Sequence, residues 1–285
     1  MSPSDSDLRF VEANGLRFAY FQWGQGPLVL AMHGFPDTPH SWDLIGPALA
    51  ERGYRVVAPF LRGYAPSGMP SVDTTTLTLG QDTVALIAAL GAERAHLIGH
   101  DWGTDAVYAA AGLAPKRVLS LTAIGIPHRA LVTPTPKLAW ALRHFLTLRL
   151  PGAEARFERD DFAQLELFVR RWSPTWRFTA DDLAPVKACF RQPGTVHASL
   201  GYYRASRVST PACMKQKVCV PTLCVAGADD PGVSPETYGA TRPHFTAGFE
   251  VAVIPGGHFC HRESPAQLLP RLISHLQATE ASDGL

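Results

Sequence analysis

One stretch of this chain constrains its fold more than any other. The apolar run Leu97-Ile98 ends abruptly in the sequence GHDWG at residues 99–103, and an alanine-rich segment follows at 105–111. This pattern predicts a strand, a turn too tight for ordinary side chains, and a helix. Glycines stand two residues before and two residues after Asp101. They let the backbone fold sharply and push the Asp101 side chain out at the carboxyl end of the strand.

A carboxylate at the apex of such a turn narrows the chemistry that the chain can perform. It is already ionised at neutral pH, so it needs no base to remove a proton before it attacks. It is a poor nucleophile toward esters, but it can displace a strained or good leaving group from a saturated carbon. Asp101 is therefore predicted to form an alkyl ester that is later hydrolysed.

The composition favours an ordinary globular enzyme. The 285 residues are 46% hydrophobic and 18% charged, which suits one α/β domain with an insertion. The formal net charge is +1 and no block of like charges occurs, so we expect neither a nucleic-acid partner nor a membrane partner. A small neutral substrate fits this surface best, and a homodimer is possible.

The chain shows no signal for export or for bound metal. Residues 1–7 lack a basic region followed by an apolar one, and no apolar run approaches the roughly twenty residues that span a bilayer. We therefore expect a cytoplasmic protein. The five cysteines are scattered without CxxC spacing, which supports neither a disulfide framework nor a zinc site. We expect no cofactor and no metal.

Strand and helix patterns alternate through the first half of the chain. Asn14-Gly15 between the apolar segments 8–12 and 16–23 predicts a hairpin at the sheet edge. Buried strands are predicted at 28–32, 55–59 and 118–126, with helices at 41–51 and 77–90. This alternation predicts a parallel sheet with right-handed crossovers.

The alternation stops after the strand at 118–126. Helical patterns then follow at 137–148, 161–172, 180–192 and 195–205. The alternation of strand and helix then returns, with strands predicted at 221–226 and 250–254 and a closing helix at 265–277. We therefore expect a core domain made of residues 1–128 and 214–285, with a helical cap domain at 129–213.

Four motifs occur in a fixed order: HGFP at 33–36, GHDWG at 99–103, GADD at 227–230 and GGHF at 256–259. With them the chain resembles the α/β-hydrolase fold family, and within it the epoxide hydrolase branch with an aspartate nucleophile, related to haloalkane and haloacetate dehalogenases. The resemblance covers nearly the whole length. It implies a mostly parallel eight-stranded sheet, helices on both faces, and a helical cap inserted after the sixth strand.

The resemblance also implies a catalytic group. Asp101 would be the nucleophile, and His258, whose ordinary pKa lies near neutrality, would activate the water that hydrolyses the ester. A carboxylate must then hold the imidazole. Asp229 and Asp230 compete for this task, and the family's Gly-x-x-Asp spacing from Gly227 selects Asp230.

Two backbone groups and three side chains would complete the core part of the site. The tetrahedral oxyanion on Asp101 would accept hydrogen bonds from the backbone N–H groups of Phe35 and Trp102. The side chains of Phe35, Trp102 and Tyr202 would contact the substrate.

The helical insertion would act on the leaving group. The sequence GYYR at 201–204 is similar to the segment from which epoxide hydrolases project a cap tyrosine, here Tyr203. Most relatives supply a second tyrosine from an earlier segment that ends in Pro-Gly. No tyrosine occurs in 144–152, and His144 takes the expected place, where a His/Tyr pair can also polarise an epoxide oxygen. An exposed histidine without such a role is the other interpretation of His144.

The combined prediction is an epoxide hydrolase that converts a small neutral epoxide and water into a vicinal diol through an ester on Asp101. The first alternative is a haloalkane or haloacetate dehalogenase that uses the same Asp-His-Asp group. It is disfavoured because Phe35 replaces the asparagine of haloalkane dehalogenases and Trp102 replaces the arginine of fluoroacetate dehalogenases. A hydrolase-fold protein that binds a small ligand without turnover is a remote alternative.

Overall fold

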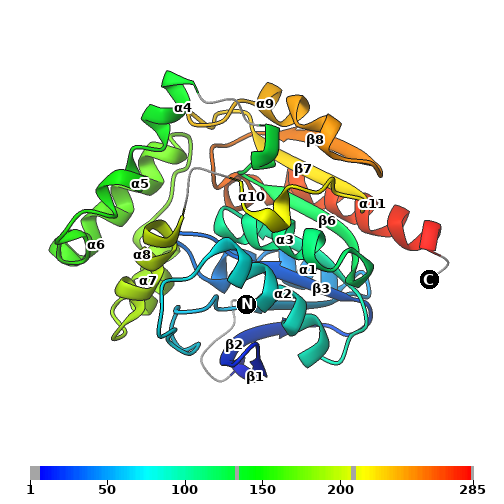
Figure 1. Ribbon diagram of the computed structural model, residues 1–285, viewed down its shortest axis with the longest axis horizontal. Helices are drawn as coiled ribbons and strands as arrows, with labels where there is room; N and C mark the ends of the chain where they lie inside the picture. Colours follow the sequence, from blue (N-terminus) through cyan, green and yellow to red (C-terminus); the bar gives the residue numbers. More distant parts are fainter. Residues whose placement is uncertain (1–6, 132–134, 207–209, 284–285) are drawn as a thin grey trace.

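An eight-stranded sheet forms the centre of the computed structural model, which describes residues 7–131, 135–206 and 210–283 (Figure 1). The strands lie side by side in the order β1-β2-β4-β3-β5-β6-β7-β8. Their bounds are β1 (Arg9–Ala13), β2 (Leu16–Trp23), β3 (Leu28–Met32), β4 (Arg55–Pro59), β5 (Ala95–His100), β6 (Val118–Ile124), β7 (Thr222–Gly227) and β8 (Phe249–Ile254).

The sheet is parallel except at its first edge. β2 pairs antiparallel with both β1 and β4, whereas every pair from β4 across to β8 is parallel. The hairpin predicted at Asn14-Gly15 is therefore confirmed, and so is its place at the edge. β5 lies between β3 and β6, so the residue that follows β5 emerges near the middle of the carboxyl edge. Ligand sites of parallel sheets lie at this edge.

Helices cover both faces of the sheet. One face carries α1 (Ile45–Ala50) and α11 (Pro265–Asp283), and the other carries α2 (Thr76–Ala89) and α3 (Trp102–Leu113). Successive strand residues point to opposite faces, so in β3 Ala31 packs with α1 and α11 while Leu30 and Met32 pack toward α2 and α3. Both faces are buried, which explains the continuous apolar runs of these strands.

The helices between β6 and β7 stand together at one side of the sheet (Figure 1). Their bounds are α4 (Pro136–Ala141), α5 (His144–Thr147), α6 (Ala153–Trp172), α7 (Ala180–Phe190) and α8 (Thr195–Ala205). We call these five helices the α4–α8 segment; its described residues contain no strand. The helical insertion after the sixth strand is therefore present, while its status as a separate domain at 129–213 stays a prediction.

Several helix predictions need correction. The helix expected at 41–51 is a 3-10 turn, η2 (Pro39–Trp42), followed by α1. Pro47 accounts for the break, because it lacks an N–H group and is tolerated only in the first turn of a helix. The helix expected at 137–148 is divided into α4 and α5, and α6 begins at Ala153 rather than 161. Within α6 the backbone leaves helical dihedral angles at residues 159–162. This element therefore consists of two helices joined by a kink.

Short elements escaped prediction because they are too brief to show a helical period. They are η3 (Pro115–Arg117), η4 (Arg129–Leu131), η5 (Ala212–Met214), α9 (Pro235–Ala240), η6 (Arg242–His244) and α10 (Cys260–Glu263). Across the described parts of the chain, every helix is too short or too polar to cross a membrane.

The turn between β5 and α3 depends on the absence of two Cβ atoms. Asp101 at its apex has φ 51° and ψ −117°, a conformation that non-glycine residues rarely adopt. A Cβ on Gly99 would lie 2.3 Å from the carbonyl oxygen of Gly103, and one on Gly103 would lie 2.1 Å from the carbonyl oxygen of Met32. The turn thus packs directly on the end of β3, with backbone against backbone.

We expect Gly103→Ala to destabilise the fold by about 1–3 kcal/mol or more, because the added methyl group collides with backbone that cannot swing away. Urea unfolding followed by circular dichroism measures this change. Gly239→Ala is the matched control, since Gly239 lies in α9 with nothing within 4 Å of an added Cβ. That variant should be as stable as the wild type or slightly more so. Equal stability of the two variants would contradict the tight-turn interpretation.

Candidate active site

The Asp101 carboxylate points into the site from the turn. It makes no side-chain capping hydrogen bond to the residues of α3 beyond its first residue, Trp102, so it does not serve only as a helix cap. Its Oδ1 accepts a hydrogen bond from the backbone N–H of Phe35 at 2.9 Å, and its Oδ2 lies 3.4 Å from His258 Nε2. The backbone N–H of Trp102 also donates to the carboxylate. Both predicted backbone donors therefore face Asp101.

The imidazole of His258 lies between two carboxylates. Its Nδ1 is 3.3 Å from Oδ2 of Asp230, and its Nε2 faces Asp101. The other oxygen of Asp230 accepts from the backbone N–H groups of Gly232 and Val233, at 2.7 and 3.2 Å. These two bonds fix the Asp230 carboxylate in the loop after β7, so one edge of the His258 ring is held in place.

Asp229 does not take this place. Its side chain is exposed, and its carboxylate accepts a hydrogen bond from the backbone N–H of Gly256 at 3.2 Å. Of the two acids that the sequence offered, the structure brings Asp230 to His258.

In this group, charge and burial shift the pKa values of His258 and Asp101 in opposite directions. Burial by itself lowers the pKa of His258, but the hydrogen bonds and charges of Asp101 and Asp230 outweigh it and raise that pKa to about 10. Burial also acts to raise the pKa of Asp101. However, the hydrogen bond and charge of His258, together with the backbone N–H groups of Phe35 and Trp102, hold the pKa of Asp101 below its ordinary value. The resting site therefore holds an imidazolium between two carboxylates.

Aromatic side chains pack together beside Asp101. The ring of Tyr203 from α8 packs edge-on against Phe35 and Trp102, with centroids 5.1 and 5.3 Å apart. Phe145 lies 4.9 Å from the Tyr203 ring and 5.9 Å from Trp102. The predicted oxyanion residues and the predicted cap tyrosine thus form one wall, built from three distant parts of the chain.

The two neighbouring tyrosines of α8 use their hydroxyls differently. The Tyr202 hydroxyl donates to the carbonyl oxygen of Arg62 at 2.6 Å, so it is already engaged by the core. The Tyr203 hydroxyl receives a hydrogen bond from the Trp102 side chain, and burial together with the charge of Asp101 raises its pKa well above the ordinary value. Tyr203 therefore remains a protonated donor near Asp101, while the substrate contact predicted for Tyr202 stays a prediction for its ring alone.

His144 is buried rather than exposed, with 7% of its surface accessible. Its ring lies 5.7 Å from that of Tyr203 and 4.8 Å from that of Trp172. Burial lowers the pKa of His144 to about 4, so the ring is neutral. Its Nδ1 faces the carbonyl oxygen of Ala141 at 3.1 Å and Nη2 of Arg171 at 3.2 Å. The structure thus brings His144 and Tyr203 together, as expected.

A buried polar group supports the loop that carries His258. Ser41 Oγ lies 2.6 Å from both Asp37 Oδ2 and His261 Nε2, and His100 Nε2 donates to the backbone oxygen of His258 at 3.0 Å. Among the described residues, Asp37, His100 and His261 form a group whose possible metal-ligand atoms lie within 4.8 Å of one another. Their hydrogen bonds join them to Ser41 and to the His258 backbone, so they position this loop.

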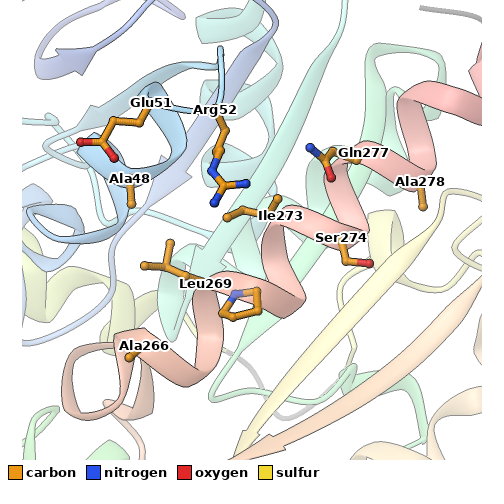
Figure 2. Close-up of a pocket in the computed structure, with 10 residues that line it drawn as sticks. Ala48, Glu51, Arg52, Ala266, Leu269, Ile273, Ser274, Gln277 and Ala278 are labelled. Carbon is orange, nitrogen blue, oxygen red and sulfur yellow. The ribbon is translucent and has the colours of Figure 1, made fainter.

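A separate groove of about 700 Å³ lies on the outer surface between α1 and α11 (Figure 2). It is lined by Ala48, Glu51, Arg52, Ala266, Leu269, Pro270, Ile273, Ser274, Gln277 and Ala278. These helices cover one face of the sheet, whereas Asp101 lies at its carboxyl edge. The groove contains none of the residues described above and is not part of the candidate site.

Sequence reasoning missed the contribution of the end of α6. The backbone N–H of His258 donates to the carbonyl oxygen of Trp172 at 2.9 Å, and that of Phe259 donates to Ser173 Oγ at 2.8 Å. Arg171 in the same turn contacts His144. Two arginines at the end of an amphipathic helix look like solvated residues in the sequence, and no local pattern shows which of them faces inward.

The chain is similar to known proteins along most of its length. Residues 27–265 match a family model described as alpha/beta hydrolase fold. The AB hydrolase superfamily protein YfhM of Bacillus subtilis is 31% identical over 278 residues, which cover 94% of this chain and 97% of that protein. Epoxide hydrolase A of Mycobacterium tuberculosis is 29% identical, with 95% and 98% covered.

A solved structure confirms the likeness of fold. The crystal structure of a mutant epoxide hydrolase from Bacillus megaterium superposes with a TM-score of 0.84, at 24% identity, over 94% of this chain and 100% of that chain. At this identity the likeness shows the fold alone.

We expect Asp230→Asn to lower the pKa of His258 by about 1–3 pH units, because one of the two neighbouring charges is removed. A histidine NMR titration measures this pKa. Asp229→Asn is the matched control and should leave the pKa unchanged, since Asp229 is exposed and bonds to Gly256 instead. An equal decrease in both variants would mean that Asp230 is not the specific partner of His258.

Proposed function

Because the chain belongs to the α/β-hydrolase fold family, we propose that it is an epoxide hydrolase that adds water to a small neutral epoxide and yields a vicinal diol. One observation carries the proposal: the Asp101 carboxylate faces His258 through Oδ2, and its charge acts on the nearby phenol of Tyr203. Relatives such as epoxide hydrolase A support the same activity. The packed aromatic side chains suit a neutral substrate.

The two oxygens of Asp101 have different tasks in this mechanism. Oδ1 is held by the backbone N–H of Phe35, whereas Oδ2 faces His258. Oδ2 attacks a ring carbon, the carbon–oxygen bond breaks, and the ring oxygen takes the electron pair and then the proton that His258 gives up when Asp101 becomes a neutral ester. Tyr203 and His144 donate hydrogen bonds to this developing alkoxide, and the α4–α8 segment acts as the cap that supplies them.

Water then cleaves the ester. It adds to the carbonyl carbon of Asp101, His258 takes its proton, and Oδ1 becomes the oxyanion stabilised by the N–H groups of Phe35 and Trp102. Collapse of the tetrahedral intermediate breaks the bond between the Asp101 carbon and the alcohol oxygen, and it releases the diol with a proton returned to its oxygen. Asp230 stabilises the imidazolium that forms.

Ester formation changes His258 from an acid to a base. In the free enzyme the charge of Asp101 contributes to the raised pKa of His258, so the ring is protonated at neutral pH. The ester carries no charge, so that contribution is lost while the effects of burial and Asp230 remain. The pKa of His258 therefore falls once alkylation has occurred, and the neutral ring can accept a proton from water.

The two half-reactions should be separable in His258→Gln. We expect this variant, mixed with styrene oxide, to consume about one epoxide per active site and to gain the mass of one epoxide on the peptide that contains Asp101. Intact-protein and peptide mass spectrometry measure the adduct. The wild type should show it only transiently, because hydrolysis keeps removing it.

Asp101→Asn is the control for this trap and should gain no mass. A His258→Gln protein that stays unmodified, or an adduct on His100 or Cys260, would contradict attack by Asp101. Bromoacetate with a free-halide assay distinguishes the dehalogenase reaction, since it gives halide without diol. Protein that binds styrene oxide and releases no product would instead indicate a ligand-binding protein.

Removal of the Tyr203 hydroxyl should slow the first step. We expect Tyr203→Phe to lower the single-turnover rate of alkylation by about 10²-fold or more, because one donor to the alkoxide is lost. Tyr202→Phe is the matched control on the same helix, and its hydroxyl already bonds to Arg62. The Tyr202→Phe variant should lower the free energy of unfolding while leaving the alkylation rate less affected than Tyr203→Phe does. A larger rate loss in Tyr202→Phe would mean that the roles of the two tyrosines are reversed.

A further inference from the structure

Three polar atoms meet at the base of the His144 ring. The Nη2 of Arg171 lies 3.2 Å from His144 Nδ1 and 3.2 Å from the carbonyl oxygen of Ala141. The same carbonyl oxygen lies 3.1 Å from His144 Nδ1. All three distances are within hydrogen-bond range, so the position of the proton on His144 decides which bonds form.

Each protonation state of Nδ1 allows two hydrogen bonds among these three atoms, but the two states differ in what faces the guanidinium charge. A guanidinium group donates and cannot accept, and each terminal nitrogen carries two hydrogens. If Nδ1 is unprotonated, Arg171 donates one hydrogen to Nδ1 and the other to the Ala141 oxygen, and its positive charge offsets the repulsion between these two acceptors, which lie 3.1 Å apart. If Nδ1 carries the proton, it donates to Ala141, but an N–H group of Arg171 then points at the N–H group of His144 with no acceptor between them.

The surroundings of the ring favour the same pattern. The aromatic side chains of Phe145, Phe168, Trp172 and Tyr203 pack around His144, with ring centroids 4.8 to 6.1 Å away. Burial keeps the imidazole neutral, so it carries a single N–H group. When Arg171 occupies Nδ1, that single N–H group is on Nε2.

Arg171 is held where this bond requires it. Its guanidinium lies over the rings of Phe168 and Trp172, at 5.6 and 5.4 Å from their centroids. The next residues of the chain are tied to the His258 loop, because the carbonyl oxygen of Trp172 accepts from the backbone N–H of His258. The end of α6 is therefore fixed relative to the reacting groups.

We infer that Arg171 is a positioning residue that fixes the tautomer of His144 with its proton on Nε2, and that this makes His144 a hydrogen-bond donor beside Tyr203. The tautomer follows from the contacts and from the burial of the ring, whatever the function. Its effect on ring opening rests on the proposed function. A neutral imidazole with the proton on Nδ1 would offer only a lone pair at Nε2 and would repel the developing alkoxide.

The tautomer is measured directly by ¹⁵N NMR of the full-length protein labelled at histidine, with His144→Gln used to identify the resonances. We expect the wild type to show an unprotonated Nδ1 and a protonated Nε2. Arg171→Met should move the proton to Nδ1, where Ala141 accepts it, and Arg171→Lys should keep the wild-type pattern because an ammonium group also donates. A proton on Nδ1 in the wild type would overturn the inference.

Arg170→Met is the matched control. Arg170 is the exposed neighbour on α6, and its guanidinium lies over Phe178, away from His144. Its substitution should leave the His144 resonances unchanged. Equal changes in the Arg170 and Arg171 variants would show a general effect of charge or helix stability and would contradict the specific bond. Near-ultraviolet circular dichroism verifies the folding of each variant, and Arg171→Lys tests the donor even if Arg171→Met fails to fold.

Single-turnover kinetics with styrene oxide test the consequence. Arg171→Met should lower the alkylation rate as much as His144→Gln does, by about 10²-fold, and leave the rate of ester hydrolysis unchanged. The double variant should be no slower than either single variant. An unchanged alkylation rate with a reversed tautomer would overturn the positioning role. A wild type without epoxide turnover, but with the proton on Nε2, would overturn the proposed function and leave the tautomer assignment intact.

Discussion

The close approach of the turn at Asp101 to the end of β3 is the constraint on which the site depends. A Cβ at Gly103 would lie 2.1 Å from the Met32 carbonyl oxygen, so the two backbones touch with no side chain between them. This contact brings the residues after β3 beside the turn, and the N–H group of Phe35 reaches Asp101 Oδ1. The geometry of the oxyanion site is therefore a property of the backbone.

The site also depends on charge compensation among Asp101, His258 and Asp230. Two partly buried carboxylates this close together would each disfavour the ionised form of the other, but His258 lies between them and its charge stabilises both. The arrangement also links charge to reaction state, since neutralising Asp101 weakens the proton affinity of His258. A site built this way resets the protonation of its base without a separate conformational step.

The α4–α8 segment contributes through contacts that reach down to the sheet edge. Tyr202 bonds to the Arg62 backbone, and the end of α6 accepts a hydrogen bond from the His258 loop. These bonds place the Tyr203 hydroxyl and the His144 ring relative to Asp101. Because the proposed donors and the proposed nucleophile come from different layers, small shifts of the segment would change the distance between them.

The sequence by itself determined the sheet, the turn and the identity of Asp101, because strand periodicity and paired glycines are local properties. It also pointed to His258 through motifs in a fixed order and to Tyr203 through the resemblance of GYYR to a cap segment. The motif spacing selected Asp230 over its neighbour Asp229, and the tertiary structure supplied the physical reason, since only the Asp230 side chain points toward His258. The tertiary structure also showed that Arg171 faces inward: its role depends on atoms of α4 and α5 that only the packing of separate helices brings together.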